Sequence, residues 1–487
     1  MKVETAERTG SSELRRAKIV CTLGPATDSA QRLAALLDAG MNVARLNFSH
    51  GTAAEHARRL RLVRRLAGAR RIPLAVLQDL QGPKIRTGPL EQGKPVDLRP
   101  RARVTLTTRP VPGNASLIST TFQSLPREVK RGSRILLSDG LIELRVERVA
   151  GREVICRVIE GGRLGEHQGI NLPGLPLKIS ALTAKDRAVL KFGIQHGVDY
   201  IALSFVRRPE DVLELKRLLA RAGRDIPVVA KLEKPEAIDR LEEILGVADA
   251  VMVARGDLGV ELSPEMVPVI QKRVIASAND LKVPVIVATQ MLESMTAHSR
   301  PTRAEASDVA NAIFDGADAL MLSGETATGR YPVESVQMMA RIIRAAEASP
   351  RYAWYARRRR STDQPLTVPE AIGESVAHLA EDLNLKAVAV FTQSGSSARL
   401  VSKYRPRVPV YAFSPLPQIL SRTALYWGVI PVGMPQVQST DRMVEGADRL
   451  LRARGVVEPG DLIAVVAGTP LARRGTTNLL KVHRIEK

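Results

Sequence analysis

Eight short apolar runs, each followed by a segment with helical periodicity, constrain the fold of this chain more than any other feature. Strands that alternate with amphipathic helices are typical of parallel α/β folds. Eight such units predict a closed (β/α)₈ barrel. An open doubly wound sheet is the alternative, but it would need a glycine-rich phosphate fingerprint at its first turn, and the sequence has none there. The runs span residues 17–23, 41–48, 73–80, 200–206, 228–232, 250–254, 284–289 and 319–323.

Two other blocks differ from this rhythm. Residues 89–169 alternate polar and β-branched residues between Gly, Asn and Asp turns, which predicts a small β domain inserted in the barrel. A separate α/β block follows the four arginines at 357–360. The expected segments are an N-terminal tail (1–16), the barrel (17–88 and 170–356), the inserted domain (89–169), a linker (357–364) and a C-terminal α/β domain (365–487).

The chain carries 72 Lys and Arg against 51 Asp and Glu, a formal net charge of +21, which attracts anions of any kind. A nucleic-acid-binding protein is one hypothesis that this charge raises. Aromatic residues make up only 3% of the chain and leave few platforms for stacking bases, so we expect no nucleic-acid partner.

The two cysteines cannot form a disulfide framework, and no apolar run approaches the roughly 20 residues that span a bilayer. We therefore expect a cytoplasmic protein without a membrane partner.

The stretch 227–257 ends two neighbouring apolar runs in charged residues. Lys231 and Glu233 lie two positions apart, so on a strand they point to the same side. Asp257 ends the next run and could bring a second carboxylate beside Glu233. Two carboxylates and a lysine suit Mg²⁺, or Mn²⁺ in its place, bridging to a phosphoryl group. The other interpretation is a pair of solvated salt bridges at strand ends.

Polar side chains end the other expected strands as well. Because the active sites of (β/α)₈ barrels lie at the C-terminal ends of the strands, this pattern favours a functional mouth. Cations there can neutralise a transferring phosphoryl group, exposed amides near Gly256 could hold an anion, and Thr289 supplies a hydroxyl. No paired histidine spacing points to zinc. The strand-end residues are Arg45, Asn47, Ser49, His50, Asp79, Lys84, Arg86, Ser204, Lys231, Glu233, Asp257, Thr289, Ser323 and Glu325.

Motifs along nearly the whole chain resemble those of the pyruvate kinase family. In family order they include KIVCTLGPA, MNVARLNFSHG, DLQGPKIRTG, AKLEKPEA, VMVARGDLGVEL, ATQMLESM, SDVANAIFDGADALMLSGETATGRYP, SGSSARLVSKYRP and GTTNLLKVHRI. The resemblance implies that the barrel is catalytic, that the insertion is a small β-barrel acting as a mobile lid, and that the C-terminal block is regulatory. It also implies Mg²⁺-dependent phosphoryl transfer from phosphoenolpyruvate to ADP, giving pyruvate and ATP, by a homotetramer.

The resemblance also assigns roles to individual residues. Lys231 would stabilise the phosphoryl group in flight, with Glu233 and Asp257 holding the Mg²⁺. Arg45 and Arg86 would bind phosphoryl oxygens.

The same resemblance places the substrates. Thr289 would sit near the methylene carbon that is protonated, and the proton donor stays open. Asn47 and His50, with Arg86, would lie toward the nucleotide. The residues around phosphoenolpyruvate would be Arg45, Ser204, Lys231, Gly256, Asp257 and Thr289.

One departure from the family concerns potassium. Potassium-dependent relatives carry Glu where this chain has Lys84. By resemblance, the cation pocket is built from the equivalents of Asn47, Ser49, Asp79 and Leu80. An ammonium group there would occupy the role of the ion and repel it, which predicts activity without K⁺.

A second departure lies in the lid. The chain has Glu166, His167 and Gln168 where many relatives carry lysines near the nucleotide phosphates, whereas Asp139 is kept. The share of the lid in ATP binding is therefore left open.

The C-terminal domain contains a loop rich in hydroxyl groups between a strand and a helix. Hydroxyls and amides can cradle a phosphate, although an ordinary N-capping turn would use the same residues. By resemblance the loop binds a phosphorylated allosteric effector. Its residues would be Thr392, Ser394, Gly395, Ser396 and Ser397, with Arg473 and Arg474 supplying charge.

Two other classes of function stay open. A different Mg²⁺-dependent enolate enzyme on the same barrel, such as an aldolase or lyase, would also show paired acids at strand ends. A basic nucleic-acid-binding protein is the other.

Overall fold

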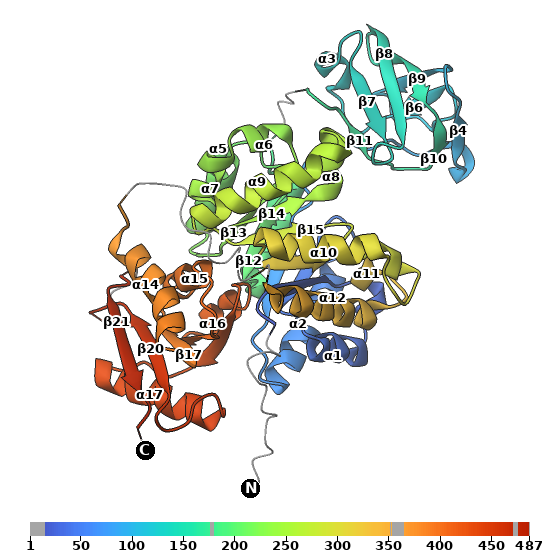
Figure 1. The fold of residues 1–487 in the computed structure, drawn as a ribbon. Coiled ribbons are helices and arrows are strands. Elements are labelled where there is room, and N and C mark those ends of the chain that lie inside the picture. Colours follow the sequence, from blue (N-terminus) through green and yellow to red (C-terminus); the bar gives the residue numbers. More distant parts are fainter. Residues whose placement is uncertain (1–14, 176–179, 351, 353–364, 471–475, 487) are drawn as a thin grey trace.

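The computed structural model describes residues 15–175, 180–350, 352, 365–470 and 476–486. Its centre is a closed barrel of eight parallel strands in the order β1-β16-β15-β14-β13-β12-β3-β2 (Figure 1). Because β1 pairs with both β2 and β16, the ring closes, which confirms the (β/α)₈ barrel and excludes the open sheet. The strands are β1 (Lys18–Thr22), β2 (Val43–Asn47), β3 (Ala75–Asp79), β12 (Tyr200–Leu203), β13 (Val228–Leu232), β14 (Ala250–Ala254), β15 (Val285–Ala288) and β16 (Ala319–Leu322).

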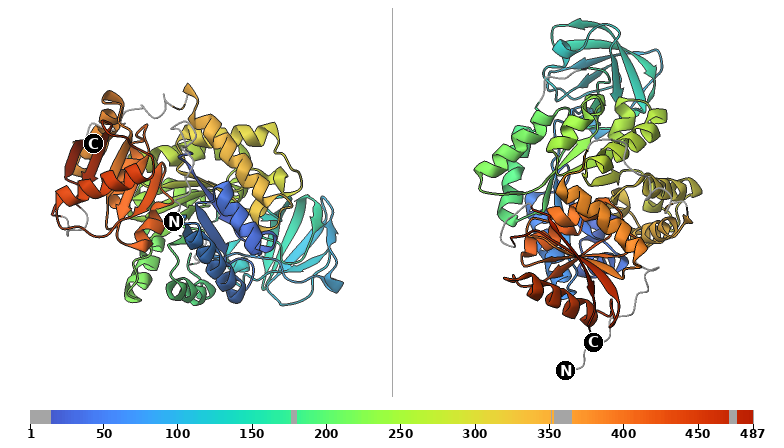
Figure 2. Two further views of the ribbon diagram at one scale, coloured as in Figure 1. Left: turned by 90° about the horizontal axis from the view of Figure 1, so that it is seen from below. Right: turned by 60° about the vertical axis from the view of Figure 1, so that its left-hand side comes forward.

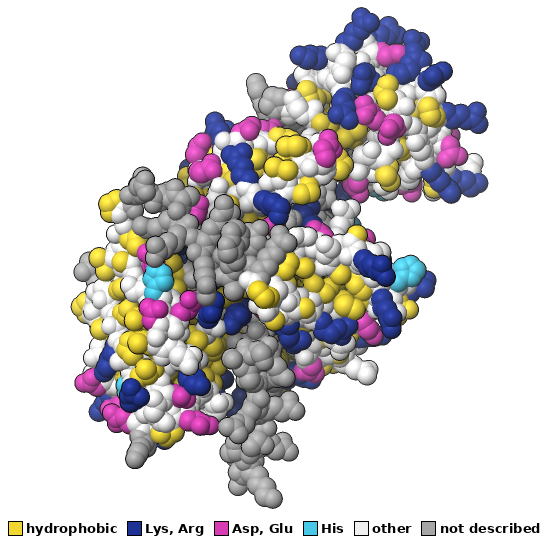
Figure 3. Space-filling view, in the orientation of Figure 1, with side chains coloured by type: hydrophobic (Ala, Val, Ile, Leu, Met, Phe, Trp, Pro, Cys, Tyr) yellow, Lys and Arg dark blue, Asp and Glu magenta, His cyan; other side chains and the backbone are white. Residues whose placement is uncertain are grey.

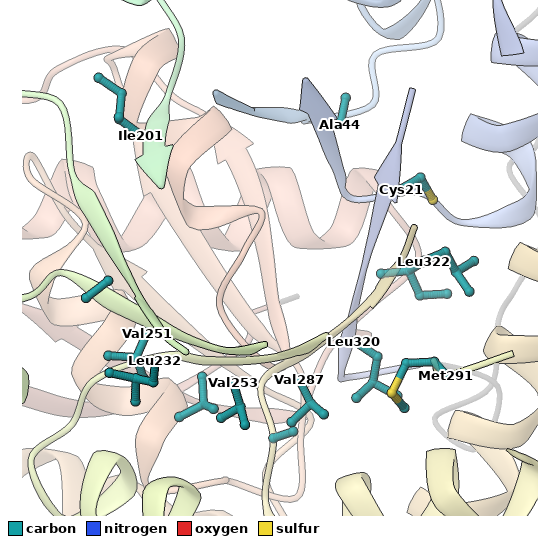
Figure 4. Close-up of a cluster of buried hydrophobic side chains, with 14 of the residues drawn as sticks. Cys21, Ala44, Ile201, Leu232, Val251, Val253, Val287, Met291, Leu320 and Leu322 are labelled. Carbon is teal, nitrogen blue, oxygen red and sulfur yellow. The ribbon is translucent and has the colours of Figure 1, made fainter. Parts of the chain in front are cut away.

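The barrel strands are buried on both faces, as expected for parallel strands between a filled interior and a ring of helices. Val251, Val253, Val287 and Leu320 belong to the cluster that packs against the surrounding helices (Figure 4). The alternate strand residues, Val229 and others, fill the interior.

Helices surround this ring. They are α1 (Ala30–Ala39), α2 (Ala53–Ala69), α4 (Ala184–His196), α5 (Pro209–Arg221), α6 (Pro235–Asp239), α7 (Leu241–Val247), α8 (Arg255–Glu261), α9 (Val267–Asp280), α10 (Arg303–Asp315), α11 (Gly324–Ala327) and α12 (Pro332–Glu347). Short 3₁₀ turns lie at η1 (Pro25–Thr27), η3 (Pro264–Met266) and η4 (Glu293–Thr296). Capping boxes, such as the reciprocal bonds between Thr52 and Glu55, start several of these helices.

The helices that follow β13 and β14 are short. The helical pattern across 237–245 is divided at Arg240, whose backbone is not helical, so it forms α6 and α7. α8 begins directly at the end of β14 and precedes the longer helix α9, which follows Pro264. Glycines at 256 and 259 weaken the helical signal of α8 in the sequence.

The insertion is a curled six-stranded sheet in the order β11-β7-β8-β9-β5-β6 with a two-stranded ribbon, β10-β4, beside it. It has its own hydrophobic core and stands at one end of the barrel next to α8 (Figure 1). β11 pairs with β7, so the sheet extends to Asn171. Its elements are β4 (Val96–Leu98), β5 (Arg103–Thr107), β6 (Leu117–Ser119), β7 (Arg134–Leu137), β8 (Ile142–Ala150), β9 (Glu153–Glu160), β10 (Gly162–Leu164), β11 (Ile170–Asn171), η2 (Glu91–Gly93) and α3 (Leu125–Glu128).

The C-terminal block is a five-stranded sheet in the order β19-β18-β17-β20-β21, with β21 antiparallel. The sequence pattern did not indicate β19, because Pro431 interrupts it; the strand lies at the edge of the sheet, where proline is tolerated. The elements are β17 (Ala387–Phe391), β18 (Val410–Ser414), β19 (Val429–Gly433), β20 (Leu462–Ala467), β21 (Leu479–Arg484), α14 (Val368–Asp382), α15 (Ser396–Lys403), α16 (Pro417–Thr423) and α17 (Thr440–Ala453).

This C-terminal domain packs on the base of the barrel, at the N-terminal ends of the strands. Asp318, which precedes β16, accepts from Lys403 Nζ at 2.7 Å and from Arg405 at 2.9 Å. Lys18 Nζ donates to the carbonyl of Val429 at 2.7 Å. The inserted sheet and the C-terminal domain thus lie at opposite ends of the barrel (Figure 2). Within the described part of the chain, no helix has both the length and the apolar character needed to cross a bilayer.

Candidate active site

The C-terminal ends of four neighbouring strands bring together a buried cluster of charges. Lys231 Nζ lies 2.9 Å from Glu233 Oε1 and 3.4 Å from Asp79 Oδ1. The other oxygen of Asp79 accepts from Arg45 Nε at 2.7 Å. Ser204 Oγ accepts from Lys231 Nζ at 2.8 Å and donates to the carbonyl of Leu80 at 2.7 Å. The sequence predicted that these side chains share the mouth, and the structure joins them into one network.

The charges in this cluster support one another. Burial by itself lowers the pKa of Lys231, but Asp79 and Glu233 outweigh it and raise that pKa above its usual value. Burial raises the pKa of Asp79, yet Lys231 and Arg45 hold it below its usual value. Glu233 differs: burial raises its pKa, Lys231 opposes this, and the charge of Asp257 adds to it. The cluster therefore contains two cations, Arg45 and Lys231, and one carboxylate, Glu233, whose negative charge is only partly balanced.

A second group forms where β14 and β15 end. The amide of Gly256 donates to Thr289 Oγ1 at 2.8 Å, and that hydroxyl donates to the carbonyl of Ala288 at 2.6 Å. Thr289 and Gln290 have φ values of 69° and 53°. Left-handed backbone is rare for a β-branched residue, so this turn is strained. Asp257 lies in the first turn of α8, immediately after Gly256.

The metal expectation rests on Glu233 and Asp257. Among the described residues no group of three or more His, Cys, Asp or Glu side chains is arranged to hold a metal ion. Glu233 and Asp257 follow the adjacent strands β13 and β14, and Glu233 Oε2 accepts from the amide of Phe205 at 2.7 Å. Paired carboxylates that leave further positions to substrate oxygens and water are typical of Mg²⁺ sites.

The turn after β2 holds the residues assigned to the nucleotide and to the potassium pocket. Asn47 lies opposite Asp79 in the register of β2 with β3, and its Oδ1 accepts from the amide of Ser49 at 3.1 Å. His50 follows, and burial together with the charges of Lys84 and other nearby cations lowers its pKa. The Lys84 side chain is exposed and makes no ion pair with an acidic residue in the described ranges.

Arg86 belongs to the lid side of the mouth. Its backbone forms a β-bridge with Gly169, and its guanidinium donates to the carbonyl of His167 at 2.8 Å. The lid residues that depart from the family hold this connection together: Glu166 accepts from the amide of Leu90 at 2.8 Å, and the amide of Gln168 donates to Thr87 at 2.9 Å. No contact joins Arg86 to the Arg45–Asp79–Lys231 cluster in the described residues.

A cavity of about 670 Å³ separates the barrel from the inserted sheet. Glu261, at the end of α8, crosses this space: its Oε1 accepts from Lys234 Nζ at 2.6 Å and from Asn171 Nδ2 at 2.9 Å. The walls include Lys84, Ile85, Asp139, Asn171, Phe205, Lys234, Asp257 and Glu261.

Several residues at this site were not predicted from the sequence. Lys234 directly follows a predicted metal ligand, and that proximity was the available signal; Arg255 directly follows a predicted strand and lies two residues before Asp257, but no role was assigned to it. Asp308, which pairs with Arg255, lies on α10 and carries no local signal at all. Glu325, noted only as a strand-end residue, is fully buried and accepts from the amides of Leu292 and Ser323.

The C-terminal loop lines a second cavity, of about 650 Å³, far from the mouth. The amide of Gly395 donates to Thr392 Oγ1 at 2.8 Å, and the hydroxyls of Ser394 and Ser396 lie 2.9 Å apart. The hydroxyls of Ser397 and Thr477 lie 2.7 Å apart, with Thr477 two residues before the last strand, β21. Arg473 and Arg474 lie outside the described residues.

Comparison with known proteins identifies the family. The model of the pyruvate kinase barrel domain matches residues 14–336, and that of the pyruvate kinase alpha/beta domain matches residues 370–483. A pyruvate kinase of Staphylococcus saprophyticus is 46% identical over 97% of this chain and 81% of its own length. One from Geobacillus stearothermophilus is 46% identical over 97% of this chain and 80% of its own. The crystal structure of a pyruvate kinase from Cryptosporidium parvum superposes with a TM-score of 0.90 at 34% identity, covering 99% of this chain and 98% of that one. The chain therefore belongs to the pyruvate kinase family and carries the pyruvate kinase activity of glycolysis.

Proposed function

We propose that Lys231 and Arg45 neutralise the phosphoryl group as it passes from phosphoenolpyruvate to ADP, and that Asp79 holds both cations in place. The observation that carries this proposal is one buried carboxylate, Asp79 on β3, which contacts Arg45 on the adjacent strand β2 and Lys231 on β13, on the far side of β12. Cations fixed in advance stabilise developing charge without reorganising, which is the main electrostatic demand of phosphoryl transfer. The raised pKa of Lys231 keeps its ammonium group charged at neutral pH.

Glu233 and Asp257 are the proposed ligands of the divalent ion. Burial raises the pKa of Glu233, and the negative charge of Asp257 adds to this, so a cation between the two carboxylates would be stabilised and the pair fits Mg²⁺ and also Mn²⁺. When bound, the ion supplies Lewis-acid stabilisation of negative oxygens on the substrate. The amide of Phe205 keeps the Glu233 carboxylate oriented toward this position.

Phosphoenolpyruvate is proposed to bind with its carboxylate near Gly256, Asp257 and Thr289. Ser204, whose hydroxyl accepts from Lys231, is proposed to lie beside the substrate as well. The amide of Gly256 already donates to Thr289 Oγ1, so a substrate carboxylate oxygen takes over that donor when it binds. The hydroxyl of Thr289 is then released beside the methylene carbon that accepts a proton. The proton donor itself is left unassigned.

The nucleotide is proposed to lie toward Asn47, His50 and Arg86. The lowered pKa of His50 keeps its imidazole neutral near pH 7, where it can donate or accept one hydrogen bond. Arg86 leaves the carbonyl of His167 to reach a phosphate when the lid moves.

We propose that Lys84 replaces a potassium ion. Its charge already acts on His50, beside the turn of Asn47 and Ser49, and Asp79 lies opposite Asn47. In this arrangement a permanent ammonium group serves where relatives use a monovalent ion. The test is turnover in a potassium-free Tris or tetramethylammonium buffer: activity that needs added K⁺ would overturn the proposal.

A phosphorylated metabolite is proposed to regulate the enzyme from the C-terminal domain, residues 365–487, which follows a linker at 357–364. Thr392, Ser394 and Ser396 line a cleft that opens to solvent, where their amides and hydroxyls could bind a phosphate group. Titration of sugar phosphates and AMP against phosphoenolpyruvate saturation curves tests this, and no shift with any of them contradicts it.

We further propose a cytoplasmic homotetramer. Two separate faces expose apolar side chains: Met266 in η3 with Val269 in the first turn of α9, and Val482 on the edge strand β21. A tetramer with dihedral symmetry needs two distinct self-complementary patches on each subunit. Light scattering after size-exclusion chromatography measures the mass, and a monomer would contradict the proposal.

The decisive experiment is a coupled assay of ADP-dependent pyruvate formation on the wild type and on Lys231→Ala. We expect the variant to lose nearly all turnover, because it removes the cation that faces the phosphoryl group. Full activity in the variant would refute the role of Lys231. An aldolase or lyase would form pyruvate without ADP, and a nucleic-acid-binding protein would not form it at all.

A further inference from the structure

The turn that carries Thr289 is held in a costly conformation by groups outside the mouth. Thr289 and Gln290 both adopt left-handed φ values, 69° and 53°. Two successive residues of this kind, the first of them β-branched, persist only where the surroundings over-determine them. Contacts from neighbouring residues must therefore offset the conformational strain of this turn.

Arg255 makes those contacts. One terminal nitrogen of its guanidinium donates to the carbonyl of Thr289 at 2.8 Å and to that of Gln290 at 3.2 Å. The other terminal nitrogen donates to the two carboxylate oxygens of Asp308 at 2.8 and 2.6 Å, with Gln271 at 3.4 Å. A planar guanidinium with fixed donors can hold two carbonyls in one orientation, which a lysine cannot do.

The position of Arg255 in the chain links the turn after β15 to the start of α8. Arg255 immediately precedes Gly256 and Asp257, so its backbone starts α8 while its side chain holds the turn after β15. The amide of Gly256 meets Thr289 Oγ1 at 2.8 Å across the same gap. One residue thus sets the distance between the proposed metal ligand and the hydroxyl of Thr289.

We infer that Arg255 and Asp308 are positioning residues that hold Thr289 in its left-handed conformation for protonation of the enolate. The inference rests on the proposed role of Thr289 near the methylene carbon. Asp308 acts through Arg255 from α10, on the outside of the barrel. Without it the guanidinium of Arg255 loses its only carboxylate among the described residues, and the turn is free to relax toward an ordinary backbone conformation.

The test compares Asp308→Asn with Asp308→Glu and with the exposed control Asp38→Asn, which removes a carboxylate from an ion pair with Arg70 on the outer helices. For each protein we measure kcat, the KM values for phosphoenolpyruvate and ADP, the melting temperature, and deuterium incorporation into the methyl group of pyruvate in D₂O with ATP and Mg²⁺. Thr289→Ala is the benchmark for the proton step.

We expect Asp308→Asn to lower kcat and methyl exchange together by about tenfold, equivalent to about 1.4 kcal/mol, with the KM for ADP and the melting temperature close to wild type. Asp308→Glu should restore most of both rates, Arg255→Lys should match Asp308→Asn, and Asp38→Asn should match the wild type. Wild-type exchange in Asp308→Asn, or a loss of kcat explained by a lower melting temperature and not rescued by Glu, overturns the inference. Wild-type exchange in Thr289→Ala overturns instead the proposed role of Thr289, so the two failures are distinguishable.

Discussion

Asp79 lies between the two cations that we assign to the phosphoryl group, and Asp79→Asn removes its charge with almost no change in size. The carboxylate lies 2.7 Å from Arg45 Nε and 3.4 Å from Lys231 Nζ. At an effective dielectric constant of about 20, these distances correspond to attractions of about 6 and 5 kcal/mol before the cost of burial. Loss of one partner from a buried ion pair typically costs about 3–5 kcal/mol. In the variant Lys231 still pairs with Glu233, and Arg45 still donates a hydrogen bond to Thr22. We therefore expect the free energy of unfolding to fall by about 3 kcal/mol, the lower end of this range.

The assay for this prediction has two parts. Urea unfolding should show a lower midpoint with an unchanged slope, which reports stability alone. The coupled assay should show kcat/KM for phosphoenolpyruvate reduced by about tenfold or more, because each tenfold loss needs only about 1.4 kcal/mol of lost transition-state stabilisation.

The pH dependence of the Asp79→Asn effect has a definite sign. The folded-state pKa of Asp79 lies below its usual value, since Lys231 and Arg45 outweigh the effect of burial. The stability that Asp79 contributes is therefore fully present above its unfolded pKa of about 3.9 and is lost as the pH falls through the folded value. The stability difference between wild type and variant should be constant above about pH 5 and should shrink below about pH 4.

A matched control separates folding from catalysis. Asp199→Asn removes another buried carboxylate, which pairs with Arg64 at 2.5 Å near the base of the barrel. It should lower the urea midpoint and leave kcat of the folded enzyme unchanged. An Asp79→Asn enzyme with wild-type midpoint and wild-type kcat/KM would refute the reasoning.

Three further predictions concern other parts of the molecule. Lys84→Glu should make turnover depend on added K⁺, measured as activity with and without KCl, and equal rates in both would contradict the ion-replacement proposal. Glu261→Gln should weaken the contact between Asn171 in β11 and α8, and the measured result should be faster proteolysis of the lid and a higher KM for ADP. If neither value changes, Glu261 does not hold the lid to the barrel. Lys18 is buried, which lowers its pKa to about 7. Between about pH 7 and 10 the folded protein has released this proton while the unfolded chain still binds it, so the stability of the wild type relative to Lys18→Met should increase with pH. A difference in unfolding midpoint between the two proteins that does not change with pH would refute this.

The parts of the fold that follow from local pattern could be predicted from the sequence. All eight barrel strands lie within the predicted apolar runs, and the two-residue spacing of Lys231 and Glu233 places them together at the end of β13. The contact of Lys231 with Asp79 depends on β12 pairing with both β3 and β13 across the inserted domain, and no local pattern reports that.

Other parts of the site depend on contacts between elements that are distant in the chain. Asp308 follows Arg255 by more than fifty residues, and only the packing of α10 against the barrel makes it a partner. Glu166 and Gln168 depart from the family motif but hold backbone amides of the lid connection, a use that residue type alone does not reveal. Local sequence therefore predicts which residues line the mouth better than which residues hold them in place.

The β-bridge between Arg86 and Gly169 means that the chain leaves the barrel and returns to it at adjacent points. An insertion whose two ends meet is tolerated in the way that a longer hairpin loop is tolerated, because the host barrel keeps its strand order whatever the loop contains. The lid is therefore a module that protein engineering can exchange for a lid from a relative, or for a turn of two residues, with the barrel left to fold on its own connections. Because Asn47 and His50 belong to the barrel, such an exchange would measure how much the inserted domain adds to a proposed nucleotide site that the barrel retains.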